Sequence, residues 1–112
     1  MRVKAELKGT TLSVKVAGEF DIIIAEEFKK TVDSYLDTGL AKYLLVDLSQ
    51  VTFIDSSGLG AILGRYKKVE HLKGKMVIAG PKIQVKRILE VSGINKVIGI
   101  YKDRNSAMSQ LS

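Results

Sequence analysis

Apolar residues recur along this chain with two alternating periods. Five segments have the alternating or continuous apolar pattern of β-strands, at about residues 2–8, 11–17, 43–48, 75–79 and 97–101. Four other segments have apolar residues every three or four positions, as on one face of an α-helix, and they begin near residues 21, 57, 80 and 103. The predicted order of elements is therefore β-β-α-β-α-β-α-β-α.

Turn residues support several of these boundaries. Asp21 is a candidate N-cap for the first helix, and Asp103 or Asn105 can cap the last one. Gly80-Pro81 is expected to open the third helix, because proline has no N–H to lose at an early helical position. Gly93 is expected to end that helix.

Strands that alternate with helices favour a largely parallel sheet. The nearly continuous apolar run at residues 43–48 suits a strand that is buried on both faces. The first two strands are close enough in sequence to form a hairpin, which would add an antiparallel edge. We therefore predict one α/β domain over residues 1–112, with a mixed, mostly parallel sheet of about five strands and four helices.

Asp55-Ser56-Ser57-Gly58 is the segment with the most functional information. It follows the strand at 43–48 and a short connector that carries Val51 and Phe53, and it precedes a helical pattern. Backbone amides at a helix start lack partners and carry partial positive charge, so a phosphate is electrostatically favoured there. A helix cap by serine, worth about 1 kcal/mol, is the simpler interpretation of the same residues.

Three glycines argue for more than a cap. Gly58, Gly60 and Gly64 each cost about 1 kcal/mol relative to alanine inside a helix. Gly60 and Gly64 share one helix face, which another backbone can approach closely. That backbone belongs either to the domain's own sheet or to a partner protein. We also expect the missing side chain of Gly58 to let a kinase bring its phosphate near, with the first-turn amides steadying the phosphoryl group.

Common catalytic and cofactor motifs do not fit. The glycines lack the acidic residue of a dinucleotide-binding turn, there is no Gly-Lys-Ser/Thr phosphate loop, and the serines do not lie in a Gly-x-Ser-x-Gly elbow. Cysteine is absent, and the only histidine, His71, is expected about 20 Å from Ser56 along the helix. A magnesium site made from Asp47 and Asp55 would have few ligands. We expect no enzyme activity, no cofactor and no metal.

Charge is distributed unevenly. Residues 1–59 carry seven Lys or Arg and nine Asp or Glu, whereas residues 60–112 carry eleven and three, for a net charge of +6. The basic residues are scattered and aromatic residues are few, which argues against direct DNA binding. No apolar run is long enough to span a membrane, and no secretory leader is visible, so a cytoplasmic location is expected.

The stretch Phe53–Lys67 resembles the signature of the anti-sigma factor antagonists, the bacterial members of the STAS domain family. Within that family it most resembles the stage II sporulation type. Gly18-Glu19-Phe20-Asp21 resembles the Gly-Glu-Leu-Asp segment of the family, and residues 85–93 resemble its third helix and following turn. The resemblance thus spans nearly the whole chain, and Ile22-Ile23-Ile24 departs from it where the sporulation protein has polar residues.

The resemblance implies a partner-switching protein that is not itself an enzyme. Ser56 corresponds to the phosphorylated serine. The unphosphorylated chain would hold an ADP-bound anti-sigma factor serine kinase and so release a sporulation-type sigma factor. ATP-dependent phosphorylation of the chain would end this binding. A serine phosphatase would restore the unphosphorylated serine. The implied partner-binding residues are Gly18, Glu19, Phe20, Asp21, Ile22, Ile23, Asp55, Ser57, Gly58, Leu59 and Gly60.

Other functions stay open at this point. The basic half suits a STAS module of a membrane-transport or nucleotide- or lipid-sensing complex, which would lie near anionic head groups. A small phosphotransferase lacks an evident base or phosphate loop, and a nucleic-acid binder is disfavoured by the scattered charge.

Overall fold

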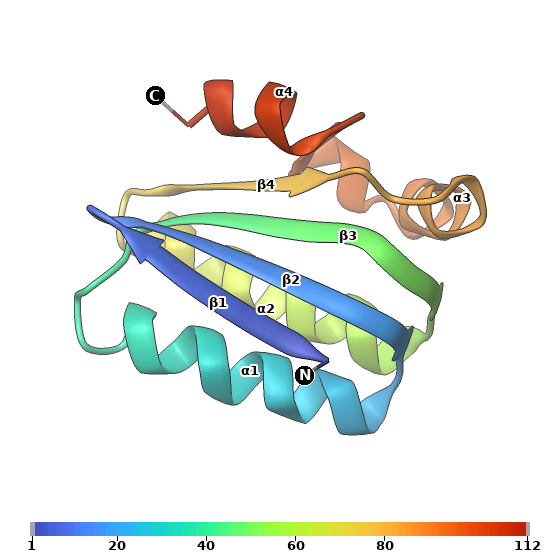
Figure 1. Cartoon of the computed structure of the whole chain (residues 1–112), viewed down its shortest axis with the longest axis horizontal. Coiled ribbons are helices and arrows are strands. Elements are labelled where there is room, and N and C mark those ends of the chain that lie inside the picture. The colour runs from blue at the N-terminus through green and yellow to red at the C-terminus, as the bar shows by residue number, and fades with distance from the viewer. Residues whose placement is uncertain (1, 112) are drawn as a thin grey trace.

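The computed structural model describes residues 2–111 and confirms the predicted order of elements (Figure 1). The strands are β1 (Val3–Lys8), β2 (Thr11–Phe20), β3 (Tyr43–Ile54), β4 (Lys75–Ala79) and β5 (Gly99–Tyr101). The helices are α1 (Ile22–Leu36), α2 (Ser56–His71), α3 (Ile83–Ser92) and α4 (Arg104–Ser109), with a 3-10 turn, η1 (Ile94–Lys96), before β5.

The five strands form one sheet in the order β1-β2-β3-β4-β5. β1 is antiparallel to β2, as predicted from the hairpin, and all other neighbouring pairs are parallel. Parallel strands end at the same edge of a sheet, and the last residues of β2 and β3, Phe20 and Ile54, are paired. The chain segments that follow these two strands therefore start side by side.

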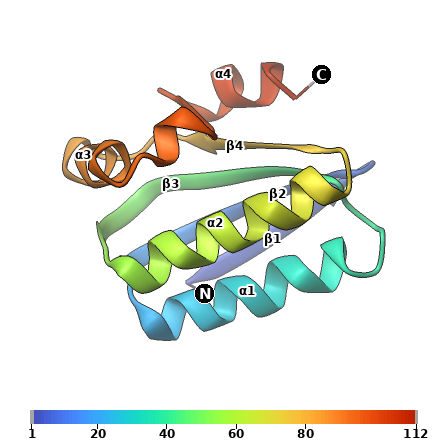
Figure 2. The ribbon, with the colours of Figure 1, turned by 180° about the vertical axis from the view of Figure 1, so that it is seen from behind.

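Helices cover the sheet on both faces. α1 and α2 lie along one face, and α4 lies across the other (Figure 2). Alternate strand residues supply the two cores, because successive side chains of a strand point to opposite faces. Leu44 and Val46 belong to the main core with α1, α2 and α3, whereas Leu45 packs with Ala107 of α4.

The most substantial departure from the sequence prediction is in β3. The expected connector around Val51 is part of this strand, which continues to Ile54. Two shifts in the β2–β3 register mark bulges in the strand. Leu48, Val51 and Ile54 are buried, and a pair of exposed residues lies between each of them and the next. Because buried residues recur every third position here, this part of β3 lacks the alternating apolar pattern by which a strand is recognised in a sequence.

Three boundaries also differ from the prediction. β2 continues beyond residue 17 to Phe20, because it follows the extended β3. α3 begins at Ile83 with Lys82 as N-cap, so Pro81 lies just outside the helix. The last strand begins at Gly99, two residues later than expected, since η1 occupies part of the preceding segment. Gly93 ends α3 in the left-handed region, with φ 86°, as expected.

A cluster of charged residues joins α1 to α2. Arg65, which is 8% exposed, places Nε 3.1 Å from Asp33 Oδ1, and Lys68 Nζ lies 3.3 Å from the same oxygen. Lys68 also donates to Asp37 at 2.8 Å. The bond to Asp37, aided by Asp33, raises the pKa of Lys68 against the opposing effect of desolvation. A half-buried arrangement of this kind favours one alignment of two helices over others.

Asp103 caps α4, and its role gives a pH-dependent prediction. Its Oδ1 accepts a hydrogen bond from Ser106 N at 2.7 Å, and this bond lowers the pKa of Asp103 below its ordinary value of 3.8. The cap should therefore stabilise the fold fully above pH 3.8, with the contribution lost as pH falls through the lowered folded-state pKa. Asp103→Ala should lower Tm most near neutral pH, and its difference from the parent should shrink in acid. Asp103→Asn retains a capping oxygen and is the control; a constant difference for Asp103→Ala at all pH values would contradict the assignment.

Candidate functional site

Two helix starts lie next to each other at the carboxyl edge of the sheet. Asp21 follows β2 and caps α1, with Oδ1 accepting from Ile23 N and Ile24 N, each at 3.1 Å. Asp55 follows β3 and caps α2, with Oδ1 accepting from Ser57 N at 2.8 Å and from Gly58 N at 3.2 Å. The predicted cap at Asp21 is confirmed. At α2 the cap is Asp55 and not a serine.

Because Asp55 takes the capping role, the hydroxyl of Ser56 is left free. Ser56 is the first residue of α2 and is exposed. No hydrogen bond to its side chain occurs within residues 2–111. Ser57 is half-buried, and its amide is held by Asp55. Geometry therefore favours Ser56 over Ser57 as the hydroxyl that another protein can reach.

The electrostatics of this helix start differ from expectation. Ser57 N and Gly58 N already bind the carboxylate of Asp55, so these two amides are not free to steady a phosphoryl group as we expected. A phosphate on Ser56 would instead be added next to an existing carboxylate. The positive end of the helix dipole offsets only part of that repulsion.

Gly58 has a different role from the one predicted. It is buried, and a Cβ atom there would lie 2.6 Å from the carbonyl oxygen of Phe20 and 2.8 Å from Ile54 Cγ1. Its missing side chain thus lets α2 pack closely on the end of β2, and does not open a path for a kinase. A Cβ atom at Gly60 or Gly64 would meet nothing within 4 Å beyond the backbone of its own helix. The bare helix face formed by Gly60 and Gly64 therefore does not pack against the domain's own sheet. A partner protein is the remaining candidate of the two that the sequence suggested.

Exposed apolar side chains lie on the elements next to the start of α2. Ile22 and Ile23, in the first turn of α1, are 63% and 60% exposed, whereas Ile24 is buried. Phe53, one of the residues moved outward by the second bulge, is 48% exposed. Sequence reasoning missed Phe53 as a surface residue because it placed the residue in a connector. The alternation of single buried residues with exposed pairs was the available signal.

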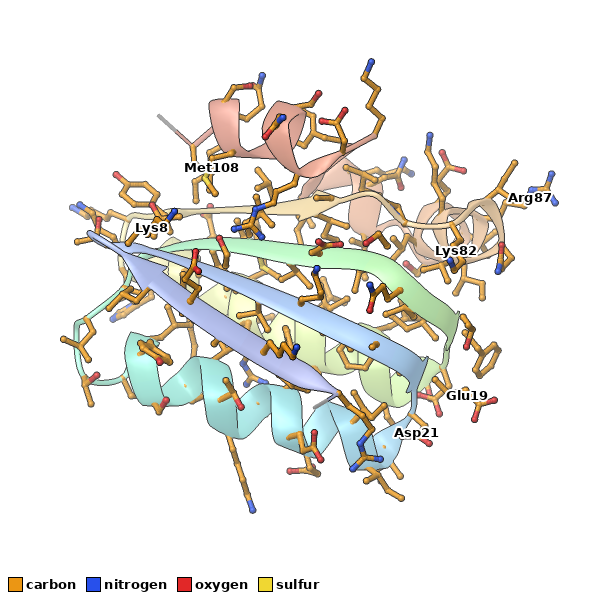
Figure 3. The ribbon with its side chains drawn as sticks, viewed as in Figure 1. Lys8, Glu19, Asp21, Lys82, Arg87 and Met108 are labelled. Carbon is orange, nitrogen blue, oxygen red and sulfur yellow. The ribbon has the colours of Figure 1, made fainter. Side chains whose placement is uncertain are left out.

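The other predicted contact residues are divided between surface and interior. Glu19 and Gly60 are exposed and Leu59 is half-buried. Phe20 is fully buried, so it lies beneath this surface together with Gly58. Figure 3 shows Glu19 and Asp21 at one end of the long axis of the molecule. Lys82, the N-cap of α3, and Arg87 of α3 lie at the same end of that view.

Residues considered for metal or base chemistry are not brought together. Asp47 lies within β3 and accepts from Ser49 N at 2.9 Å, eight residues before Asp55, or roughly 25 Å along an extended strand. His71 is the last residue of α2, at the opposite end of that helix from Ser56. Within residues 2–111 no group of three or more potential metal-ligating side chains occurs. None of the helices in that part of the chain has the length and apolar character needed to cross a membrane.

Comparison with known proteins defines the class of this fold and site. The STAS domain model matches residues 2–107, and the chain belongs to the STAS domain family. The anti-sigma F factor antagonist of Paenibacillus polymyxa is 30% identical over 111 residues, which cover 99% of this chain and 95% of that protein.

Solved structures agree with the fold. The anti-sigma factor antagonist SpoIIAA in its unphosphorylated form matches with a TM-score of 0.86 and 21% identity, over 96% of this chain and 94% of that one. Its phosphorylated form, from Bacillus, matches with a TM-score of 0.80 and 20% identity, over 98% and 99% of the two chains. A sulfate transporter family protein from Wolinella succinogenes matches with a TM-score of 0.81 and 16% identity, over 95% and 88%. At these identities the structures show a shared fold alone.

The two kinds of glycine in α2 give a matched pair of variants. Gly58→Ala should destabilise the fold by about 2 kcal/mol, because the new Cβ would overlap the Phe20 carbonyl and Ile54. Gly60→Ala has open space and a better helix former, so it should stabilise the fold by up to about 1 kcal/mol. Urea unfolding of both variants measures these changes. Equal stability of the two would contradict the inward orientation of Gly58.

Proposed function

We propose that this chain is an anti-sigma factor antagonist whose binding is switched off by phosphorylation of Ser56. The observation that carries the proposal is the exposed Ser56 hydroxyl, free of protein hydrogen bonds within residues 2–111, beside the exposed Ile22, Ile23 and Phe53. The similarity to the anti-sigma F factor antagonist from Paenibacillus polymyxa supports the assignment to this class of protein. Structures of SpoIIAA in both unphosphorylated and phosphorylated forms support a switch by phosphorylation.

The proposed partner is an anti-sigma factor that is also a serine kinase. The unphosphorylated chain holds this kinase in its ADP-bound form, which releases a sporulation-type sigma factor. ATP-dependent transfer of a phosphoryl group to Ser56 Oγ, with loss of the hydroxyl proton and release of ADP, ends the interaction. A serine phosphatase restores the hydroxyl. The chain acts as substrate and competing binder in the cytoplasm, and the kinase supplies the catalytic groups.

Phosphorylation acts through charge at the docking surface. The group adds about −1.5 to −2 charges and strongly hydrated oxygens. A partner that covers Ile22 and Phe53 would have to strip water from that phosphate, which is costly unless the partner supplies cations. The Asp55 carboxylate at the same helix start adds to the negative charge there. A loss of about 3 kcal/mol in binding free energy corresponds to roughly a hundredfold weaker affinity.

Binding to a sporulation-type anti-sigma kinase loaded with ADP tests this mechanism. Ser56→Ala should bind as tightly as the parent, and Ser56→Asp should bind roughly a hundredfold more weakly, because the aspartate adds a charge at the interface. Isothermal titration calorimetry measures the affinities. Ser57→Asp, at the half-buried neighbour, is the positional control and should cost less. Equal affinities for Ser56→Ala and Ser56→Asp would exclude the switch.

Two further measurements locate the site. Incubation with the kinase and ATP, followed by mass spectrometry, should place the phosphate on Ser56, and a phosphate found only on Ser57 would exclude that assignment. Gly60→Val introduces a branched side chain on the open face of α2, where an added Cβ atom meets nothing within 4 Å. It should weaken kinase binding severalfold while the fold stays intact, and unchanged binding would show that this face lies outside the interface.

A further inference from the structure

A concave surface, separate from the region around Ser56, lies on the face of the sheet that is turned away from α1 and α2. The register pairs Lys4 with Lys15 and Glu6 with Ser13, so these four residues of β1 and β2 share that face. α4 packs on β3, β4 and β5 and leaves β1 and β2 open. The sheet-face hollow, lined by these four residues together with Gln50 and Arg104, has a volume of about 370 Å³.

Ser13 is the first sign that this hollow is built for a ligand. The residue is only 6% exposed, but its hydroxyl oxygen is open to the hollow and makes no hydrogen bond within residues 2–111. The hydroxyl is therefore available both to donate and to accept a hydrogen bond. Since Ser13 lines the hollow, an occupant of the hollow is positioned to supply the partner.

The first bulge in β3 supplies a second, independent sign. Leu48 and Val51 face the main core, and the register steps from Lys15–Asp47 to Ala17–Gln50. The extra residue turns Gln50 to the open face, where it lines the hollow. Bulges often re-aim a side chain next to a functional site. A regular strand would keep its alternation and give no such side chain here.

The charges around the hollow are mostly positive and poorly paired. Lys4 and Lys15 form no ion pair in the part of the chain that the structure describes, and Arg104 has only a 4.0 Å contact with Glu6. Asp47, next to Lys15 across the β2–β3 pair, is 6% exposed and binds Ser49 N. Three cations and the free hydroxyl of Ser13 thus line one hollow, together with a single carboxylate, that of Glu6.

We propose that the sheet-face hollow binds a small molecule that carries a phosphoryl group. The guanidinium of Arg104 matches two phosphate oxygens, and Lys4 and Lys15 provide charge. The Ser13 hydroxyl and the Gln50 amide add neutral donors. Ligand pockets of about 300–1,000 Å³ hold small organic molecules, so the hollow has room for a phosphate and an attached group of sugar size. This site is separate from Ser56 and needs no anti-sigma factor.

The test is an NMR titration of the isotope-labelled chain with glycerol 3-phosphate and with ribose 5-phosphate at low salt. Saturable shifts are expected at the amides of Ser13, Lys15 and Arg104, with a Kd of about 1 mM or tighter. Ser13→Ala should weaken binding severalfold. The double variant Lys15→Gln/Arg104→Gln should weaken it at least tenfold, because it removes two of the three cations.

The controls separate a specific site from general attraction of anions. Lys30→Gln/Lys67→Gln removes the same charge from exposed positions on α1 and α2 and should leave the affinity within about twofold. Ser56→Ala should bind like the parent, so this proposal and the antagonist function can fail separately. Thermal unfolding verifies that each variant is folded. Absence of saturation at about 10 mM ligand, an equal loss in the control double variant, or equally tight binding of succinate would overturn the proposal.

Discussion

The backbone carbonyl of Phe20 is the point on which both helix starts depend. It accepts a hydrogen bond from Asp55 N at 3.4 Å, and only glycine at position 58 allows α2 to pack against it. This contact fixes the start of α2 relative to the end of β2, and α1 begins two residues after that end. The cluster of Asp33, Arg65 and Lys68 holds the same two helices farther along their lengths. Ser56 and the apolar residues of α1 are therefore presented together on a rigid base.

The two faces of the sheet differ in what covers them and in the function that we propose for each. On one face, apolar strand residues are covered by α1, α2 and α3, and the exposed helix starts provide the proposed docking surface. On the other face, α4 covers only part of the sheet and leaves a charged hollow over β1 and β2. The basic residues in the second half of the chain therefore do not form a single patch. Arg104 contributes to the hollow, whereas Lys82, the N-cap of α3, and Arg87 of α3 lie at the end of the molecule that also carries Glu19 and Asp21 (Figure 3).

Sequence reasoning succeeded where the periods were strong and local. The order of elements, the sheet class and the caps at Asp21 and Asp103 follow from patterns within a few residues. The inward orientation of Gly58 was missed, although its spacing from the buried Ala61 and Ile62 places it on the same helix face. The sheet-face hollow was beyond reach, because it depends on the register between strands and on the place of α4, and neither has a signature in the residues of one strand.

Because of the bulges of β3, the number of residues before Asp55 is constrained as well as the identity of the buried ones. Thr52 is exposed, so substitution there is tolerable. Removal of one residue would eliminate one of the two bulges and exchange the inner and outer sides of the residues that follow it. Ile54 would then leave the interior, and Asp55 would lose its alignment with β2. Variation among natural versions of this segment should consist of replacements and not of gaps.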